Sequence, residues 1–268
     1  MTDPIAPLIN ALHAEGRLRV WSLVITVFGD LVQCRGGAIT TTRLGRIMGR
    51  IGVEQGALRT ALSRLGQDGW VTSTRSGRIS IYRLSPDGLA QIGPATSRIY
   101  AAPRIAPVTD WRLCVSLDGK GLPRLRPADE PAPPGEADLR LTGHLDTLSD
   151  AWRTAALAED HRAMLLALDA DLTALESLPA EADPLTFAVA RMLLIHRWRR
   201  LVLRHDEVPA ELMPPDMPRA NPRADVARAY ARLCAGAEAW MDLSGEDLAP
   251  MPAANGALAK RFGSVEET

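Results

Sequence analysis

The sequence lacks long apolar runs and paired cysteines. No segment approaches the roughly 18–20 consecutive apolar residues that cross a bilayer, which excludes a membrane-spanning chain. Cys34, Cys114 and Cys234 lie far apart and fit neither a disulfide framework nor a CxxC metal site. A secretory signal has a positively charged residue before its apolar stretch. Here no Lys or Arg precedes the short apolar stretch before His13. We therefore expect a cytoplasmic protein.

The motifs of common enzyme classes are also missing. GxGxxG, GxxxxGK[ST], GxSxG and HExxH do not occur. The histidines are scattered, and His144 with the nearby Asp146 is more typical of a surface or capping pair than of a metal site. We expect no catalytic residue, no metal ion and no cofactor.

The charge is unevenly distributed. Residues 1–100 hold 12 Lys and Arg against 6 Asp and Glu, whereas the rest of the chain holds 19 against 26, and the net charge is −1. Only Lys120 and Lys260 are lysines, a bias that reduces what arginine abundance alone can indicate. A basic part joined to an acidic part favours a protein of which one end contacts a polyanion.

Hydrophobic residues make up 46% of the chain, and their period changes along it. The first hundred residues predict helices followed by a two-stranded hairpin around Ser76-Gly77. The predicted elements are a helix over Leu18–Gln33, a second capped by Thr40, Thr41 or Thr42, a third over Glu54–Gln67, strands over Val71–Arg75 and Arg78–Leu84, and a helix toward Ile99. This order is typical of a winged helix-turn-helix.

The rest of the chain divides into two parts. Residues 101–147 are proline-rich, with strands predicted over Trp111–Leu117 and Ala137–Leu141 and a loop over Pro127–Gly135. Residues 148–268 predict helices over Leu148–Leu178 (broken near Glu159), Leu185–Arg204 and Asp225–Leu243. The predicted fold class is α+β and mostly α, with a DNA-binding domain over residues 1–100, a small central region over 101–147 and a helical effector or dimerisation domain over 148–268.

An apolar seam runs along the last predicted helix. Its members are Val226, Tyr230, Leu233, Ala237 and Trp240. We interpret this seam as core packing, with a dimer contact as the alternative.

The third predicted helix carries the candidate DNA-contacting residues. With its leucines turned to the core, its other face displays Gln55, Arg59, Thr60, Ser63, Arg64 and Gln67. Arginine binds guanine and glutamine binds adenine with paired hydrogen bonds, so this face suits base and phosphate contacts. Arg75 and Arg78 at the hairpin tip, and Thr41 and Thr42 at the start of the second helix, are candidate phosphate contacts. The alternative is that Arg59 and Arg64 are ordinary solvated helix residues, with or without ion pairs to the acidic part.

Several segments resemble one family. WSLVITVFG (Trp21–Gly29), LRTALSRLGQDGWV (Leu58–Val71), SGRISIYRLSPDG (Ser76–Gly88), Arg98-Ile99-Tyr100 and LLIHRWRRLVLRHDEVPAELMPPDMP (Leu193–Pro218) are similar to the phenylacetate-degradation repressors, or PaaX-type regulators. The resemblance implies a homodimeric transcriptional repressor of aromatic-acid catabolism that binds double-stranded operator DNA and is released by phenylacetyl-coenzyme A or a related thioester. It also implies a ferredoxin-like central domain, which is truncated here because Leu117–Gly121 runs almost directly into Pro123 and the proline loop.

A second cluster is a candidate effector site. His196, Arg197 and Arg200 lie close together on one predicted helix, where they can hold phosphates, and Trp152 and Trp198 can wall an aryl group. The alternative is that the arginines pair with local acids such as Asp206 or Glu207 and that the tryptophans are core.

Two other functions compete with the regulator. One is a DNA-binding protein without a small-molecule ligand, in which the helical part serves dimerisation or partner binding. The other is a metal-dependent nuclease-like enzyme using Asp110 and Asp118, which flank a predicted strand. The operator sequence, the inducer and the choice between repression and activation stay open.

Overall fold

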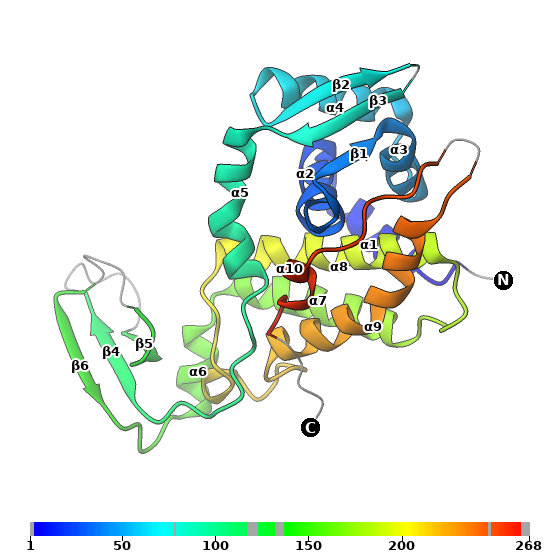
Figure 1. The fold of residues 1–268 in the computed structure, drawn as a ribbon. Helices are drawn as coiled ribbons and strands as arrows, with labels where there is room; N and C mark the ends of the chain where they lie inside the picture. Colours follow the sequence, from blue (N-terminus) through cyan, green and yellow to red (C-terminus); the bar gives the residue numbers. More distant parts are fainter. Residues whose placement is uncertain (1–2, 78, 117–122, 132–136, 246–247, 264–268) are drawn as a thin grey trace.

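The computed structural model describes residues 3–77, 79–116, 123–131, 137–245 and 248–263. The described chain is α+β and mostly helical, with two small antiparallel sheets (Figure 1). None of its helices is long and apolar enough to cross a membrane.

The N-terminal part holds a cluster of helices beside the first sheet (Figure 1). Its elements are α1 (Ala6–Ala14), α2 (Val20–Val27), the π-helical turn η1 (Phe28–Val32), the 3₁₀ turn η2 (Gln33–Arg35), β1 (Ala38–Thr40), α3 (Thr41–Arg50), α4 (Gln55–Gln67), β2 (Val71–Ser76), β3 (Ile79–Leu84) and α5 (Pro86–Ile99). The helix predicted over Leu18–Gln33 is thus α2 continued by η1 and η2, and it ends where Gly36 adopts a left-handed φ of 77°. The elements α1 and β1 were not predicted from the sequence.

The first sheet joins the hairpin to the helices. Its order is β1-β3-β2, with all neighbours antiparallel. Val71 pairs with Leu84 and Ser76 with Ile79, so the hairpin predicted around Ser76-Gly77 is confirmed. Beyond it, α5 leads from the hairpin down to the helical part of the protein (Figure 1).

The second sheet lies apart from the main body of the protein (Figure 1). It consists of β4 (Trp111–Val115), β5 (Arg124–Pro127) and β6 (Leu139–Gly143), with β4 in the centre and an antiparallel strand on each side. Two of these strands were predicted and β5 was missed. No helix occurs among the described residues of 111–143, namely 111–116, 123–131 and 137–143.

The remaining chain is helical. It contains α6 (Asp150–Ala156), α7 (Glu159–Glu176), α8 (Pro184–Arg204), the 3₁₀ turn η3 (Ala210–Leu212), α9 (Pro222–Asp242) and the short α10 (Gly256–Ala259). The break predicted near Glu159 lies at residues 157–158, where Leu157 is extended. Every residue of the seam on α9 is buried, so core packing was the correct interpretation and the dimer alternative is wrong for this seam.

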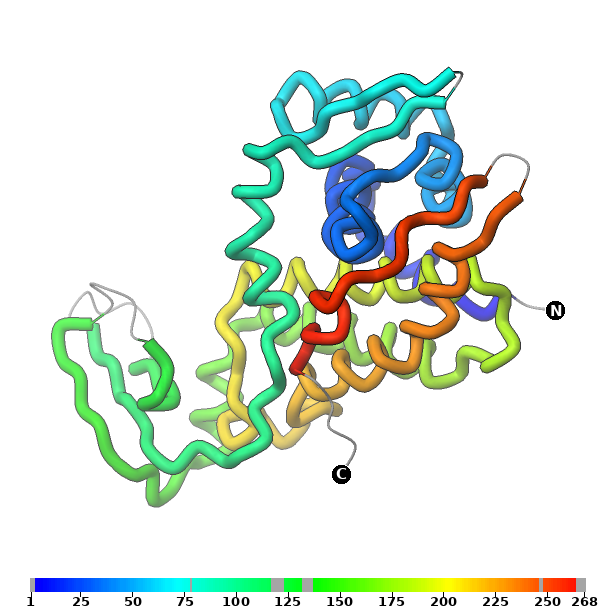
Figure 2. The backbone as a smooth tube through the Cα atoms, viewed as in Figure 1, coloured from blue at the N-terminus to red at the C-terminus, as the bar shows by residue number. Residues whose placement is uncertain are grey.

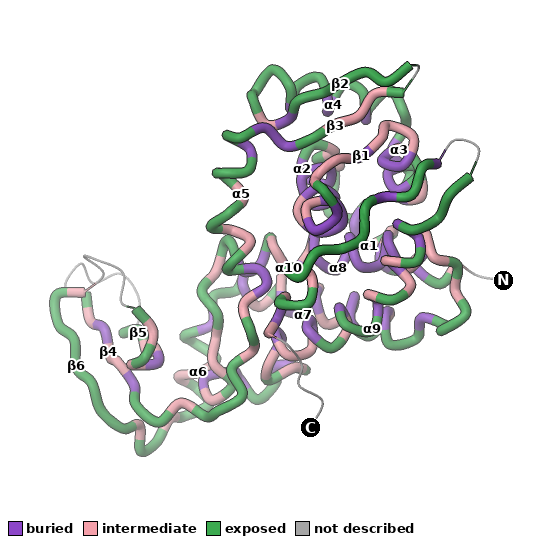
Figure 3. The backbone as a smooth tube through the Cα atoms, in the orientation of Figure 1, coloured by how far each residue is buried: buried purple, intermediate pink, exposed green. Residues whose placement is uncertain are grey.

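The central helix of the molecule is α8, which packs against α9 and α7 on one side and against α2, α3 and α5 on the other. Its residues are buried on nearly all sides from Thr186 to Trp198 (Figure 3). Gly236 lets α9 approach it closely, because a Cβ at that position would lie only 2.4 Å from the ring of Phe187. One helix therefore supports both the N-terminal part and the helical part.

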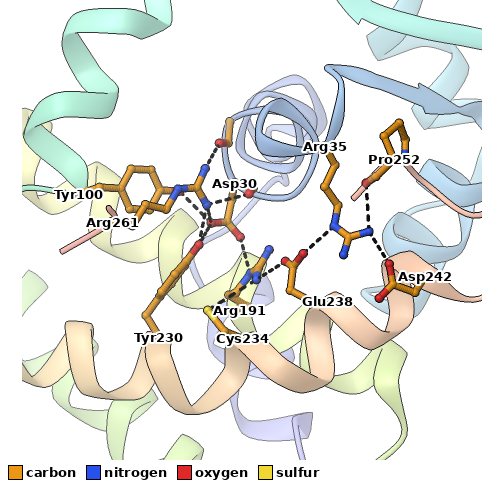
Figure 4. A network of polar contacts seen from close by, with 11 residues as sticks. Asp30, Arg35, Tyr100, Arg191, Tyr230, Cys234, Glu238, Asp242, Pro252 and Arg261 are labelled. Atoms are coloured by element: carbon orange, nitrogen blue, oxygen red, sulfur yellow. Dashed lines mark hydrogen bonds and ion pairs between the residues drawn. The ribbon is translucent and has the colours of Figure 1, made fainter. Parts of the chain in front are cut away.

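A buried carboxylate connects these parts (Figure 4). Asp30, on η1, accepts hydrogen bonds at Oδ1 from the hydroxyls of Tyr100 (2.8 Å) and Tyr230 (2.9 Å) and from Nη1 of Arg261 (2.9 Å). Its Oδ2 accepts from Nε of Arg191 at 3.1 Å. Burial is the main cause that raises the pKa of both tyrosine hydroxyls well above the usual value, and the charge of Asp30 is the second. Both hydroxyls therefore stay protonated and act as donors.

The network continues through a second acidic residue. Arg191 also donates to Oε1 of Glu238 at 2.7 Å, and Oε2 of Glu238 accepts from Nε of Arg35 at 2.5 Å. Arg35 reaches Asp242 as well, at 2.7 Å. Three carboxylates thus balance three guanidinium groups, which is the condition under which buried charge is tolerated.

The Asp30 network yields a stability prediction. Asp30→Asn removes the buried negative charge and leaves Arg191 and Arg261 without their shared counterion, so we expect a loss of about 3–5 kcal/mol in the free energy of unfolding. Chemical denaturation followed by circular dichroism measures this loss. Asp68→Asn changes an exposed aspartate and serves as the control, with no more than about 0.5 kcal/mol expected. Equal stability of the two variants would contradict the role given to Asp30.

Candidate nucleic-acid interface and effector site

Two helices and a turn position the candidate DNA-contacting side chains. α3 begins after Thr40, whose side chain caps it by accepting from the backbone N–H of Arg43. α4 follows after Ile51–Glu54 and buries Leu58, Ala61, Leu62 and Leu65. α4 packs against α2 and α3, so its opposite face is left to solvent.

The exposed face of α4 matches the prediction. Gln55, Arg59, Thr60, Ser63, Arg64 and Gln67 are all exposed. Arg59 donates to Oε1 of Gln55 at 3.3 Å, and the hydroxyl of Thr60 donates to the carbonyl oxygen of Gly56. Within the described residues, neither Arg59 nor Arg64 forms an ion pair. The described structure thus has no ion pair between these arginines and the acidic part of the chain, and the alternative of an ordinary solvated face stays open.

The β2–β3 hairpin lies beside α4 (Figure 1). Gly69, with a left-handed φ of 75°, forms the turn that leads from α4 into β2. Arg75 is exposed near the end of β2, in register with Ser80, and forms no ion pair with the described residues. Arg78 lies outside the described residues.

The two threonines at the start of α3 are half-buried. The hydroxyl of Thr41 donates to the carbonyl oxygen of Ser80 at 2.8 Å, which ties α3 to β3. This hydroxyl is thus committed inside the protein, although the helix start that Thr41 and Thr42 form lies next to the hairpin.

Arg43 anchors this unit to the helical part, a role that the sequence did not reveal. It is 1% exposed and donates to the carbonyl oxygens of Trp240 (2.7 Å), Leu243 (2.8 Å) and Ala249 (2.8 Å). Its guanidinium group lies over the Trp240 ring, 4.7 Å from the centroid. Burial, with the nearby charges of Arg35 and Arg46, lowers the pKa of Arg43 to about 10.

The chain after α9 returns to the N-terminal part of the protein. The segment from Ala249 to Phe262 lies along η1, η2 and β1 (Figure 2), where Asn255 donates its backbone N–H to the carbonyl oxygen of Cys34 at 2.8 Å. Arg261 donates to the carbonyl oxygens of Gly29 and Asp30, each at 2.8 Å. Residues 255–261 are therefore hydrogen-bonded to residues 29–34 of the N-terminal part.

The predicted effector residues are not brought together. Trp198 is 1% exposed and donates from Nε1 to the carbonyl oxygen of Ile99 at 2.9 Å, so it belongs to the core and cannot wall a ligand. Arg197 pairs with Asp171 and Glu15 rather than with Asp206 or Glu207. Trp152 lines a cavity of about 360 Å³ between β5, α6 and the chain after α8.

His196 and Arg200 line a different cavity, of about 410 Å³, between the α1–α2 loop and α8. His196 is 6% exposed, and its Nδ1 lies 2.9 Å from the hydroxyl oxygen of Thr26. Burial, with the charges of Arg199, Arg200 and Arg197, lowers the pKa of His196 to about 3. The predicted cluster therefore divides between two cavities and the core.

Of the two aspartates of the nuclease alternative, the structure describes only Asp110. Asp110 is exposed, with Oδ1 3.2 Å from Nδ1 of His144, and Asp118 lies outside the described residues. No group of three or more His, Cys, Asp or Glu that can hold a metal ion occurs in the described part of the chain.

Sequence comparison assigns the family. The family model described as PaaX-like protein matches residues 19–88, and the model described as PaaX-like protein C-terminal domain matches residues 152–243. The chain belongs to this family of PaaX-like proteins. It is similar to the transcriptional repressor PaaX of Escherichia coli (strain K12), with 29% identity over 297 residues that cover 96% of this chain and 93% of that protein. The matched regions contain α2–α4 with the hairpin and α7–α9, and the second sheet lies between them.

One solved structure also resembles the chain. The uncharacterized protein Rv0674 from Mycobacterium tuberculosis aligns with a TM-score of 0.49 and 20% identity, covering 81% of this chain and 98% of that one.

The burial of His196 yields a pH prediction. Its pKa is about 3 when folded and about 6.5 when unfolded, so the unfolded chain binds the extra proton between these values. We expect neutral His196 to make its full contribution to the free energy of unfolding above pH 6.5. Below pH 6.5 this contribution falls by about 1.4 kcal/mol per pH unit. Denaturation of wild type and His196→Gln from pH 7.5 to 5 measures the difference. The exposed His144→Gln is the comparison variant: the hydrogen bond to Thr109 and the charge of Asp110 raise the pKa of His144, so its loss should change the pH dependence in the opposite direction. Parallel stability curves for wild type and His196→Gln would contradict the expectation.

Proposed function

We propose that this protein is a transcriptional repressor that binds operator DNA through a winged helix-turn-helix formed by α2–α4 and the β1-β3-β2 sheet. The observation that carries the proposal is the exposed face of α4, whose arginines have no acidic partner in the described structure. α4 enters the major groove, where Gln55, Arg59 and Arg64 contact base edges and phosphates. Arg75 on β2 contacts the backbone beside it. The similarity to a transcriptional repressor supports this assignment.

The domains and the oligomeric state extend the proposal. Residues 1–100 form the DNA-binding domain, residues 101–147 the small central region and residues 148–268 the effector and dimerisation domain. A homodimer in the cytoplasm binds an inverted repeat, because two recognition helices must reach successive major grooves about 34 Å apart.

An aryl-coenzyme A thioester such as phenylacetyl-coenzyme A releases the repressor from its operator. The genes that the repressor controls are those of phenylacetate-type catabolism. Such an effector works by binding one dimer geometry better than the other. The anchoring of the DNA-binding domain by Arg43 and Asp30 supports this mechanism, because a shift of α8 or α9 is transmitted to α3 and η1. A DNA-binding protein without a ligand is the alternative, and a thermal-shift screen with thioesters that gave no response would favour it.

The recognition face is tested by removing its arginines. We expect Arg59→Ala/Arg64→Ala to weaken operator binding by about tenfold or more, because each guanidinium group contributes about 1–3 kcal/mol of base discrimination or a phosphate contact. Gel-shift titration on DNA selected from random fragments by the wild type measures the affinity.

The matched control for this pair is Arg228→Ala/Arg232→Ala, which removes two exposed arginines from α9. Circular dichroism should show the same helical content in both variants. Unchanged affinity of the folded Arg59/Arg64 variant would remove this face from the interface.

The hairpin is tested by the salt dependence of binding. A single phosphate contact by Arg75 predicts that Arg75→Ala weakens binding to every DNA sequence and lowers the slope of log affinity against log salt by about one unit. Titrations of the selected operator and an unrelated duplex, each at several salt concentrations, measure both effects. A loss confined to the selected operator would show that Arg75 reads bases.

A further inference from the structure

The cavity of about 410 Å³ between α1 and α8 lies outside the proposed DNA interface. It is bounded by the loop Gly16–Arg19, the first residues of α2, Met164 of α7 and the last turns of α8. It therefore touches both the DNA-binding domain and the central helix.

Positive charge dominates this cavity. Arg17 and Arg19 are exposed, and their side chains form no hydrogen bond or ion pair with the described residues. Arg200 and Arg204 line the cavity from α8 and are 45% and 64% exposed. Glu15 is the acidic residue in its lining. Such an excess of guanidinium groups at a concave surface favours an anion.

The cavity also exposes apolar side chains. Trp21 is 45% exposed and Leu203 is 40% exposed, although both belong to helices with extensive cores. A large aromatic ring beside free arginines is a suitable surface for a flat apolar group attached to a charged one.

A carboxylate of the chain already occupies part of the basic lining. Glu15 accepts from Nη1 of Arg197 at 2.5 Å and from Nη1 of Arg200. Burial opposes ionisation of Glu15, but the hydrogen bond from Arg200 and the charge of Arg197 lower its pKa overall. The two guanidinium groups are thus arranged to hold negative charge, and Glu15 competes with any anion that enters.

The inner end of the cavity connects to the DNA-binding domain. His196 lines it and contacts Thr26 of α2 through Nδ1. Arg199 donates to the hydroxyl oxygen of Thr26 at 2.9 Å and to the carbonyl oxygen of Ser22 at 3.2 Å. A ligand in this cavity would therefore press on the contact between α2 and α8.

We propose that this cavity binds a phosphate-bearing organic anion with a flat apolar group, with its phosphates on Arg17, Arg19 and Arg200 and its flat group on Trp21. The assignment rests on the proposed function, since it gives the effector a site. Arginine suits phosphate because its planar fork donates two parallel hydrogen bonds. Coenzyme A thioesters and nucleotides share this chemistry.

Isothermal titration calorimetry tests the site, with phenylacetyl-coenzyme A, coenzyme A and ATP as probes. We expect at least one probe to bind the wild type, and the probe that binds identifies the source of the ligand. Arg17→Gln/Arg19→Gln should weaken that binding by about tenfold or more, as should Trp21→Ala for a thioester. Glu15→Gln should strengthen it, because the competing carboxylate is gone.

Arg140→Gln/Arg228→Gln removes two exposed arginines elsewhere and should leave the affinity within about twofold. No binding by any probe, or equal losses in the two double variants, would overturn the proposal. So would a change of Trp21→Ala from dimer to monomer in sedimentation, because the patch would then be an interface between copies.

Gel shifts without ligand separate this proposal from the proposed function. Arg17→Gln/Arg19→Gln should bind the selected operator like the wild type, because neither residue belongs to α4 or the hairpin. If the wild type selects no DNA, the repressor assignment fails, whereas calorimetry still decides whether the cavity binds an anion.

Discussion

The carboxylate of Asp30 is the interaction on which the rest of the structure depends. It lies where α2 has become π-helical, and it is contacted from α5, α8, α9 and the segment after α9. Because a buried charge is costly unless it is paired, these contacts favour one relative position of the elements, although Nη2 of Arg191 is buried without a hydrogen-bond partner among the described residues. The relative placement of the N-terminal part and the helical part is therefore set by these hydrogen bonds and ion pairs as well as by packing.

Two buried contacts join the helical part to the N-terminal part. Arg43 holds α3 to the end of α9, and Thr26 holds α2 to His196 of α8. Both contacts are short and directional, so a small displacement of α8 or α9 must either move the N-terminal part or break buried hydrogen bonds. The mechanism proposed for effector release depends on these two contacts.

The features that depend on nearby residues were predictable from the sequence. α4, its exposed arginines and the hairpin follow from spacing within about thirty residues, and so does the break before α7. β1 is too short to show alternation, and β5 lies between prolines, so neither has a local pattern.

The candidate effector site was predicted only in part, since His196 and Arg200 line the proposed cavity and the other predicted residues do not. α8 is surrounded by other helices, so the sequence cannot tell which of its polar residues face a cavity. Trp198 faces Ile99 and Arg197 faces Asp171, partners that lie far away in the chain. Arg17 and Arg19 were not predicted as site residues, because a short loop before a helix has no periodic pattern of side chains.

The return of residues 249–262 to the N-terminal unit has a consequence for biosynthesis. The first hundred residues leave the ribosome before their partners have been synthesised. Asp30, Arg35 and Arg43 therefore stay solvated until α8, α9 and residues 249–262 have been made. The N-terminal part therefore completes its buried hydrogen bonds only after residues 249–262 have been synthesised.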